Sequence, residues 1–205
     1  MAQEIEMKLS IAKQQIKAFK KHPLIKQSQR VTDRQTLLTR YYDTPDLDLQ
    51  SQGLALRIRQ QDNQLWLTVK NSGTSQQGLH EREEWEYPIT NVNWDISSLP
   101  QALHPYIEPY YSQLQKIFTT EFQRSTWLIQ WQNTTIEAAL DMGSIYLDQQ
   151  WREPISELEL EIKEGERRGL MNFCQTLNQD LTLKPFDQSK AYRGYRLFYM
   201  ASQHA

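Results

Sequence analysis

Hydrophobic and polar residues alternate with a period of two in several stretches of the chain, the pattern of β-strands with one apolar and one polar face. These stretches are residues 4–9, 54–59, 65–70, 82–87, 123–132, 135–142 and 155–162. Turn residues at Asp62-Asn63 and at Asn133-Thr134 predict that two neighbouring pairs of strands form hairpins. Antiparallel strands therefore dominate the expected structure.

A further apolar and aromatic strand is expected at residues 37–42, and Pro88 is expected to end the strand that starts at Arg82. Helical periodicity is found at residues 11–21, 105–117, 167–177 and 190–200. No linker or repeat divides the chain. The pattern predicts an α+β fold in which residues 1–205 form one domain.

Most charged residues of the alternating stretches share a single strand face. They are Glu4, Glu6, Lys8, Arg57, Arg59, Lys70, Arg82, Glu84, Glu86, Glu157, Glu159 and Glu161. In a single strand this pattern would simply mark the solvated face. Across many strands it is harder to explain that way, because like charges two positions apart repel one another unless cations lie between them.

Length, composition and charge exclude several classes of protein. The chain has 205 residues and a net charge of −2, with no apolar run near the length that crosses a bilayer. Its first residues do not resemble a secretory signal, so a cytoplasmic protein is expected. The near-neutral charge argues against nucleic-acid coating, and the single cysteine, Cys174, can form neither an internal disulfide nor a zinc cluster.

The charged face combines two kinds of chemistry. Carboxylate oxygens are the ligands that Mg²⁺ and Mn²⁺ prefer. Guanidinium and ammonium groups, such as those of Arg57 and Lys70, bind phosphate oxygens. If the strands close into a barrel, the charged face becomes a polar lumen and the apolar face packs outward under helices. The sequence therefore predicts a site for a metal and a polyphosphate.

The order of these motifs resembles the CYTH superfamily, the triphosphate tunnel metalloenzymes, and within it the bacterial inorganic triphosphatase branch. The resemblance rests on Glu4-x-Glu6-x-Lys8, Leu56-Arg57-Ile58-Arg59, Thr68-Val69-Lys70, Arg82-x-Glu84, Phe122-Gln123-Arg124, Leu140-Asp141-x-Gly143, Glu157-x-Glu159-x-Glu161 and Ser189-Lys190-Ala191. It implies an eight-stranded antiparallel barrel, with a charged tunnel inside and helices outside, that hydrolyses inorganic triphosphate (tripolyphosphate) to pyrophosphate and phosphate.

The resemblance also implies roles for individual residues. Lys8, Arg57, Arg59 and Glu159 would be catalytic. Lys8, Arg57, Arg59, Lys70, Arg82, Arg124, Lys190 and Arg193 would bind phosphate oxygens. Glu4, Glu6, Glu84, Asp141, Glu157, Glu159 and Glu161 would hold Mg²⁺ or Mn²⁺. Charge neutralisation and alignment of the attacking water would then accelerate phosphoryl transfer.

Other functions of the same fold stay open at this point. A class IV adenylate cyclase would need a base-recognition motif, and none is found; a thiamine triphosphatase is a second enzymatic alternative. A module that only binds polyphosphate or nucleotides would be expected to lack the repulsive glutamates. The expected partners are a triphosphate, no nucleic acid and no membrane. A homodimer stays open, because aromatic residues near the C-terminus, Tyr192 and Tyr199 among them, could pack on the barrel or on a second subunit.

Overall fold

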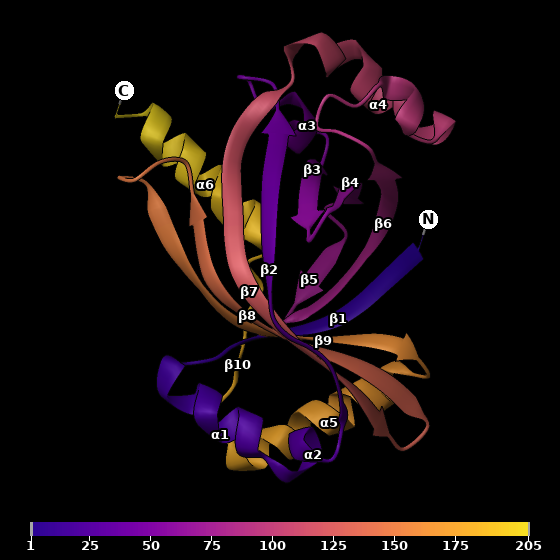
Figure 1. Ribbon diagram of the computed structural model, residues 1–205, viewed down its shortest axis with the longest axis vertical. Helices are drawn as coiled ribbons and strands as arrows, with labels where there is room; N and C mark the ends of the chain where they lie inside the picture. Colours follow the sequence, from indigo (N-terminus) through magenta and orange to yellow (C-terminus); the bar gives the residue numbers. More distant parts are fainter. Residues whose placement is uncertain (1, 205) are drawn as a thin grey trace.

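Eight antiparallel strands close into a barrel in the computed structural model, which describes residues 2–204 (Figure 1). In order around the barrel they are β1 (Ala2–Ser10), β9 (Arg152–Glu164), β8 (Thr134–Tyr146), β7 (Gln115–Trp131), β2 (Gln29–Asp43), β3 (Leu54–Gln61), β4 (Gln64–Asn71) and β6 (Leu79–Ile89). The pairing of β1 with β6 closes the ring. Two short strands, β5 (Thr74–Gln76) and β10 (Lys184–Pro185), pair with β6 and β1. The predicted barrel is confirmed.

Helices surround this barrel. They are α1 (Ile16–Lys21), α2 (Pro23–Lys26), α3 (Asp48–Ser51), α4 (His104–Ile107), α5 (Arg167–Asp180) and α6 (Lys190–Ser202). Short stretches of 3-10 helix span Lys13–Gln15, Ile96–Ser98, Gln101–Leu103 and Glu108–Gln113. In Figure 1, α1, α2 and α5 lie together at one end of the molecule and α4 lies at the other. None of the helices among residues 2–204 is long and apolar enough to span a bilayer.

The outer face of the barrel is apolar, as the alternation predicts. Under α5, a cluster that includes Leu158, Leu160 and Phe173 is fully buried. On the opposite side, Leu56 and Leu67 belong to a second cluster, which the turns around α4 cover. The residues that alternate with these leucines, such as Arg57, face the interior. Burial of the outer face therefore fixes which side chains enter the lumen.

A third apolar cluster lies inside the barrel, where α6 packs on the inner faces of β2 and β7. Tyr41 stacks on Phe118 with ring centroids 4.3 Å apart, and Tyr195 of α6 meets Phe118 edge-on at 5.2 Å. Gly194 permits this approach, because a Cβ atom there would lie 2.1 Å from the Phe118 ring. The interior is thus partly filled by α6.

Three expectations about element bounds were wrong. A helix was expected at residues 105–117, but β7 begins at Gln115 and Ile117 is a buried strand residue. Pro88 does not end its strand, since β6 continues through it and Pro88 pairs with Trp66 of β4. Proline is tolerated there because β1 pairs only with Leu79–Glu84 of β6, which leaves the other edge open beside Pro88. The helix expected at 11–21 is a 3-10 turn followed by α1.

Candidate active site

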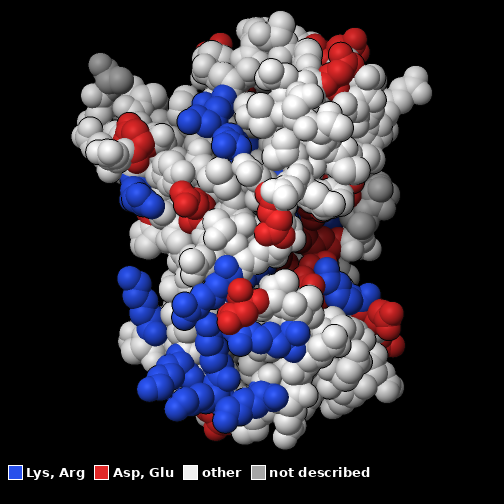
Figure 2. Space-filling model, in the orientation of Figure 1, with Lys and Arg blue, Asp and Glu red and all other residues white. Residues whose placement is uncertain are grey.

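A cavity of about 720 Å³ occupies the interior of the barrel. Most of the residues expected at the site line it: Glu4, Glu6, Lys8, Arg57, Arg59, Lys70, Arg82, Glu84, Arg124, Glu159, Glu161 and Lys190. They come from six strands and from the first residue of α6. Figure 2 shows acidic side chains in a hollow near the middle of the molecule, while Lys and Arg gather separately over the end that holds α1 and α2.

Three expected site residues do not line the cavity. Asp141 and Glu157 are completely buried, and Arg193 is 3% exposed. Arg193 donates to Glu157 Oε2 at 3.1 Å and to Glu153 Oε1 at 2.6 Å. These residues lie behind the cavity wall, where they hold other site residues in place.

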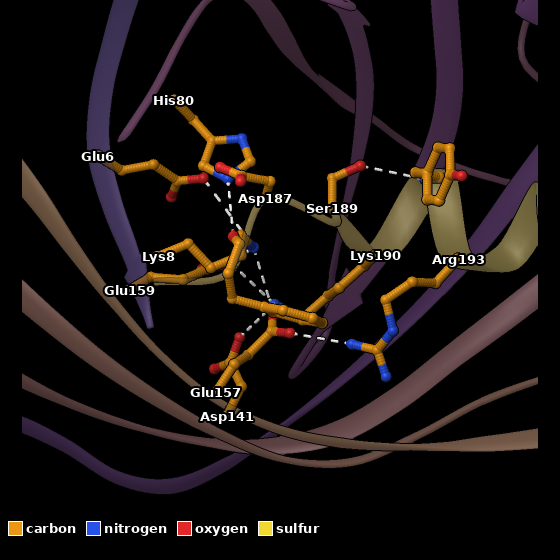
Figure 3. A network of polar contacts seen from close by, with 12 residues as sticks. Glu6, Lys8, His80, Asp141, Glu157, Glu159, Asp187, Ser189, Lys190 and Arg193 are labelled. Carbon is orange, nitrogen blue, oxygen red and sulfur yellow. Dashed lines mark hydrogen bonds and ion pairs between the residues drawn. The ribbon is translucent and has the colours of Figure 1, made fainter. Parts of the chain in front are cut away.

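Lys190 joins the cavity to these buried residues (Figure 3). Its Nζ atom lies 2.6 Å from Asp141 Oδ2, 2.5 Å from Glu157 Oε1 and 2.9 Å from Glu159 Oε1. Ser189 caps α6, since its Oγ accepts a hydrogen bond from Tyr192 N at 3.1 Å. The cap sets the direction in which the first helical side chain, Lys190, enters the barrel.

Further cations neutralise the same carboxylates. Lys8 Nζ lies 3.2 Å from Glu157 Oε1 and 2.5 Å from Glu159 Oε1. Arg124 binds Asp141 through two bonds of 2.7 Å and Glu159 at 2.6 Å. Burial opposes the charge of Glu159, yet its cationic neighbours outweigh that effect and hold the pKa of Glu159 well below its usual range. We call these six residues (Lys8, Arg124, Asp141, Glu157, Glu159 and Lys190) the Lys190 cluster.

The Lys190 cluster does not fit a divalent metal as arranged. Ligand atoms of Asp141, Glu157 and Glu159 lie within 4.8 Å of one another, which is close enough to share an ion. The ammonium group of Lys190 already sits against all three carboxylates, however. A metal there would have to displace a buried, charge-compensating lysine.

A second acidic group lies on β1, β9 and β8. Glu6 pairs in register with Glu161, and Glu161 pairs with Glu137. Burial, together with repulsion from Glu4 and Glu137, raises the pKa of Glu161 to about 6, although Lys163 opposes this. Such a carboxylate gains from a divalent cation beside it.

Glu137 and Lys163 line the cavity but were not expected at the site. Lys163 Nζ lies 2.9 Å from Glu161 and 3.7 Å from Glu137. Strand alternation could have found both, because Glu137 shares its strand face with Asp141 and Lys163 shares its face with Glu161.

The remaining cations line the wall formed by β1, β3, β4 and β6. Glu4 lies 2.9 Å from Lys70 and 2.8 Å from Arg82, and Glu84 lies 2.7 Å from Lys70 and 3.3 Å from Arg57. Burial opposes ionisation of Glu4, but Lys70 and Arg82 hold the pKa of that carboxyl far below its usual range. Both signs of charge are therefore present and ordered before a ligand arrives.

Arg59 differs from the other cations of the cavity. It makes no ion pair with a carboxylate among residues 2–204, and its Nε atom is buried without a hydrogen-bond partner. Burial and the neighbouring cations Arg57 and Arg124 lower the pKa of Arg59, although Glu86 and Glu84 oppose this. A partly buried cation in such surroundings is stabilised by an added anion.

The histidine and aromatic residues take supporting positions. His80 Nε2 lies 3.1 Å from Phe186 O, so this ring holds the segment that leads to α6 (Figure 3). Tyr195 is buried against the barrel, whereas Tyr192 and Tyr199 are 55% and 59% exposed. Packing on the barrel, one of the two arrangements left open for the C-terminal aromatic residues, therefore holds for only some of them.

A closed antiparallel barrel lined by ordered carboxylates and guanidinium groups defines a polyanion-binding tunnel. The CYTH domain model matches residues 2–195, and the chain belongs to the CYTH family.

Relatives and solved structures agree with this assignment. The chain is 37% identical over 199 residues to an inorganic triphosphatase from Haemophilus influenzae, covering 96% of this chain and 55% of the relative. It thus spans about half the length of that relative. A Hippeastrum protein described as an adenylyl cyclase with a dominant triphosphatase activity has the same fold, with TM-score 0.64, 16% identity, and 97% and 96% of the two chains covered. A Bacillus halodurans protein described as an adenylate cyclase gives TM-score 0.62 at 20% identity, with 92% and 96% covered.

Proposed function

We propose that the protein hydrolyses inorganic triphosphate to pyrophosphate and phosphate with the help of Mg²⁺ or Mn²⁺. The observation that carries the proposal is Arg59, a partly buried cation beside Arg57 that makes no ion pair among residues 2–204 and whose Nε has no hydrogen-bond partner. A bound polyanion supplies the missing negative charge. The name of the Haemophilus influenzae relative supports a triphosphate as that polyanion.

Phosphate binding falls to the cations that line the cavity. Lys8, Arg57, Arg59, Lys70, Arg82, Arg124 and Lys190 can reach a ligand in the lumen. Arg57 and Arg59 lie two positions apart on one strand face, so their forks can bind successive phosphoryl groups. Arg193, behind the wall, orients Glu157 instead of touching substrate.

The carboxylates of β1 and β9 are the proposed metal ligands. Glu4, Glu6 and Glu161 line the cavity, and the pKa of Glu161 is raised first by burial and then by the neighbouring carboxylates Glu4 and Glu137. When bound there, Mg²⁺ or Mn²⁺ would supply Lewis-acid neutralisation of phosphate oxygens and a more acidic water. Glu84 stays close enough to assist, whereas Asp141 and Glu157 act through Lys190.

The side chains themselves perform most of the chemistry. The wall formed by Arg57, Arg59 and Arg82 holds the phosphate chain straight and neutralises its equatorial oxygens as charge shifts to the leaving group. Glu159, kept ionised by Lys8 and Lys190, orients a water by accepting its proton in a hydrogen bond. Because these groups are already ordered, little reorganisation accompanies the reaction.

The chemistry of the lumen also limits the setting and the partners. We propose that residues 1–205 act as one cytoplasmic unit whose ligand is a small triphosphate, with neither nucleic acid nor membrane as partner. A phosphate chain matches a narrow interior lined by point charges.

A phosphate-release assay over several substrates tests the proposal. Inorganic triphosphate, ATP, thiamine triphosphate, pyrophosphate and long polyphosphate would each be offered with Mg²⁺ or Mn²⁺. We expect the highest kcat/KM for inorganic triphosphate and a strong loss in Arg57→Ala, with Arg168→Ala on the exposed face of α5 as the matched control. Cyclic AMP from ATP would favour a cyclase instead. Binding without release would favour a sequestering module.

A further inference from the structure

Two threonine hydroxyls in the lumen lack any hydrogen-bond partner. Thr39 is 1% exposed and Thr120 is 0% exposed, yet their Oγ1 atoms have no partner among residues 2–204. Both residues line the cavity. Buried hydroxyls normally have a hydrogen-bond partner, so two buried hydroxyls without one need an explanation.

These hydroxyls lie in one row with Arg59. Thr39 of β2 pairs in register with Arg59 of β3 on one side and with Thr120 of β7 on the other. Side chains directly opposite one another on antiparallel strands are about 5 Å apart. Three neighbouring strands therefore present three partnerless polar atoms along one line: the two hydroxyls and the Arg59 Nε.

A comparison within the same barrel shows that this is not the rule for lumen threonines. Thr68 shares the charged face of β4, and its Oγ1 donates to Glu86 at 3.0 Å. Arg59, in the Thr39 row, has as charged neighbours the cations Arg57 and Arg124 and the carboxylates Glu84 and Glu86. Neither threonine hydroxyl is hydrogen-bonded to any of these groups, so each can donate to an acceptor oxygen of a bound ligand.

We infer that Thr39 and Thr120 form, with Arg59, a subsite that donates hydrogen bonds to the non-bridging oxygens of one phosphoryl group. A tetrahedral oxyanion offers several acceptor oxygens, which matches two hydroxyls and a guanidinium on one wall. The inference rests on the proposed function. It adds two neutral hydrogen-bond donors to the cations that are proposed to bind phosphate.

The subsite lies at the end of the lumen that α6 covers. Thr120 is flanked on its strand face by Phe118, which Gly194 of α6 touches, and by Phe122, over which Lys190 lies at 4.8 Å. These aromatic rings limit access of water to the hydroxyls. Hydrogen bonds made there contribute more to binding than they would in open solvent.

The test replaces each threonine by its isostere and by serine. Thr39→Val and Thr120→Val should each lower kcat/KM for tripolyphosphate with Mg²⁺ about tenfold, because each removes a bond to a charged acceptor. The Tm of the unliganded protein should stay the same or rise, since valine removes a hydroxyl that has no partner. Thr39→Ser and Thr120→Ser keep the donor and should stay within about threefold of wild type.

Thr119→Val is the matched control, because Thr119 is buried on the opposite face of the same strand. Valine variants with wild-type kcat/KM and a wild-type rise in Tm with tripolyphosphate would overturn the inference while leaving the proposed function standing. If the wild-type protein neither releases phosphate nor gains Tm with tripolyphosphate, the proposed function fails and the subsite with it. Should one of the two valine variants not fold, the other decides.

Discussion

Two walls of the same cavity treat charge in opposite ways. In the Lys190 cluster, buried anions and cations satisfy one another within the protein. On the strands β3, β2 and β7, the Arg59 Nε and the hydroxyls of Thr39 and Thr120 have no hydrogen-bond partner among residues 2–204. The charged groups of the Lys190 cluster have their partners without a ligand, whereas Arg59 and the two threonines gain the missing partners only when a ligand binds. The contrast separates groups that support the site from groups that bind substrate.

The largest effect should come from removing Lys190, the cation at the centre of the Lys190 cluster. Lys190→Met leaves Asp141, Glu157 and Glu159 without their shared ammonium group. Loss of one partner from a buried ionic network costs about 3–5 kcal/mol of unfolding free energy. Urea unfolding without ligand would measure it, with the exposed Lys13→Met as control. Equal stability of the two variants would contradict the contrast.

Arg59→Met should give the reverse pattern. Arg59 makes no ion pair among residues 2–204, so the unliganded protein should keep its stability or gain a little, because desolvation and the neighbouring cations disfavour the charge of Arg59. Turnover should suffer instead, with kcat/KM for tripolyphosphate lower by about 100–1,000-fold, as for other well-placed transition-state donors. Steady-state kinetics and thermal unfolding on one preparation would check both. A variant that loses stability but keeps its activity would show that Arg59 supports the fold instead of binding substrate.

Chelation of metal should separate binding from catalysis. In EDTA, hydrolysis should stop, whereas tripolyphosphate should still stabilise the fold through the arginine wall. That stabilisation is about 2.7 kcal/mol when free ligand is at about 100 times its Kd. Calorimetric unfolding with and without tripolyphosphate, in EDTA and in Mg²⁺, would measure it. Absence of any ligand effect in EDTA would mean that the cations cannot hold phosphate by themselves.

A falling pH should gradually reduce the contribution of the Lys190 cluster to the stability of the folded protein. The pKa of Glu159 lies well below its ordinary value of 4.5 in the folded protein, so the unfolded chain takes up a proton more readily. Stability is therefore complete above 4.5 and falls as the pH drops below it. In Lys190→Met the pKa of Glu159 should rise and the acid-dependent loss should shrink. Urea unfolding between roughly pH 3 and pH 7 would follow both proteins. Identical pH profiles would show that Lys190 does not control this carboxylate.

The barrel could be predicted because its signal is periodic and repeated. Alternation placed Arg57 inside and Leu56 outside, and both positions are confirmed. The expectations that Pro88 ends its strand and that a helix continues to Ile117 were wrong, because pairing with a neighbouring strand decides the conformation at both positions. A single sequence does not contain those long-range pairings.

The depth of each charged residue could not be predicted. Glu157 and Glu159 follow the same alternation, yet Glu157 lies behind the wall because α6 docks over it through Lys190 and Arg193. Thr39 was missed for a different reason: a neutral hydroxyl in an apolar strand carries no charge pattern to mark it. Its importance emerges only from the partners it lacks.

The closure of the barrel by β1, which pairs with β6 and with β9, has a consequence for synthesis of the chain on the ribosome. Strand β1 pairs with β6 through its first half and with β9 through its second, and Lys8 meets Glu159, which is 151 positions further along the chain. A ribosome must therefore release the chain beyond Glu161 before β1 can pair with both of its neighbours. The residues made first are among the last of the barrel to be fixed in place, and a nascent chain cannot bind a phosphate in the lumen until β9 has emerged.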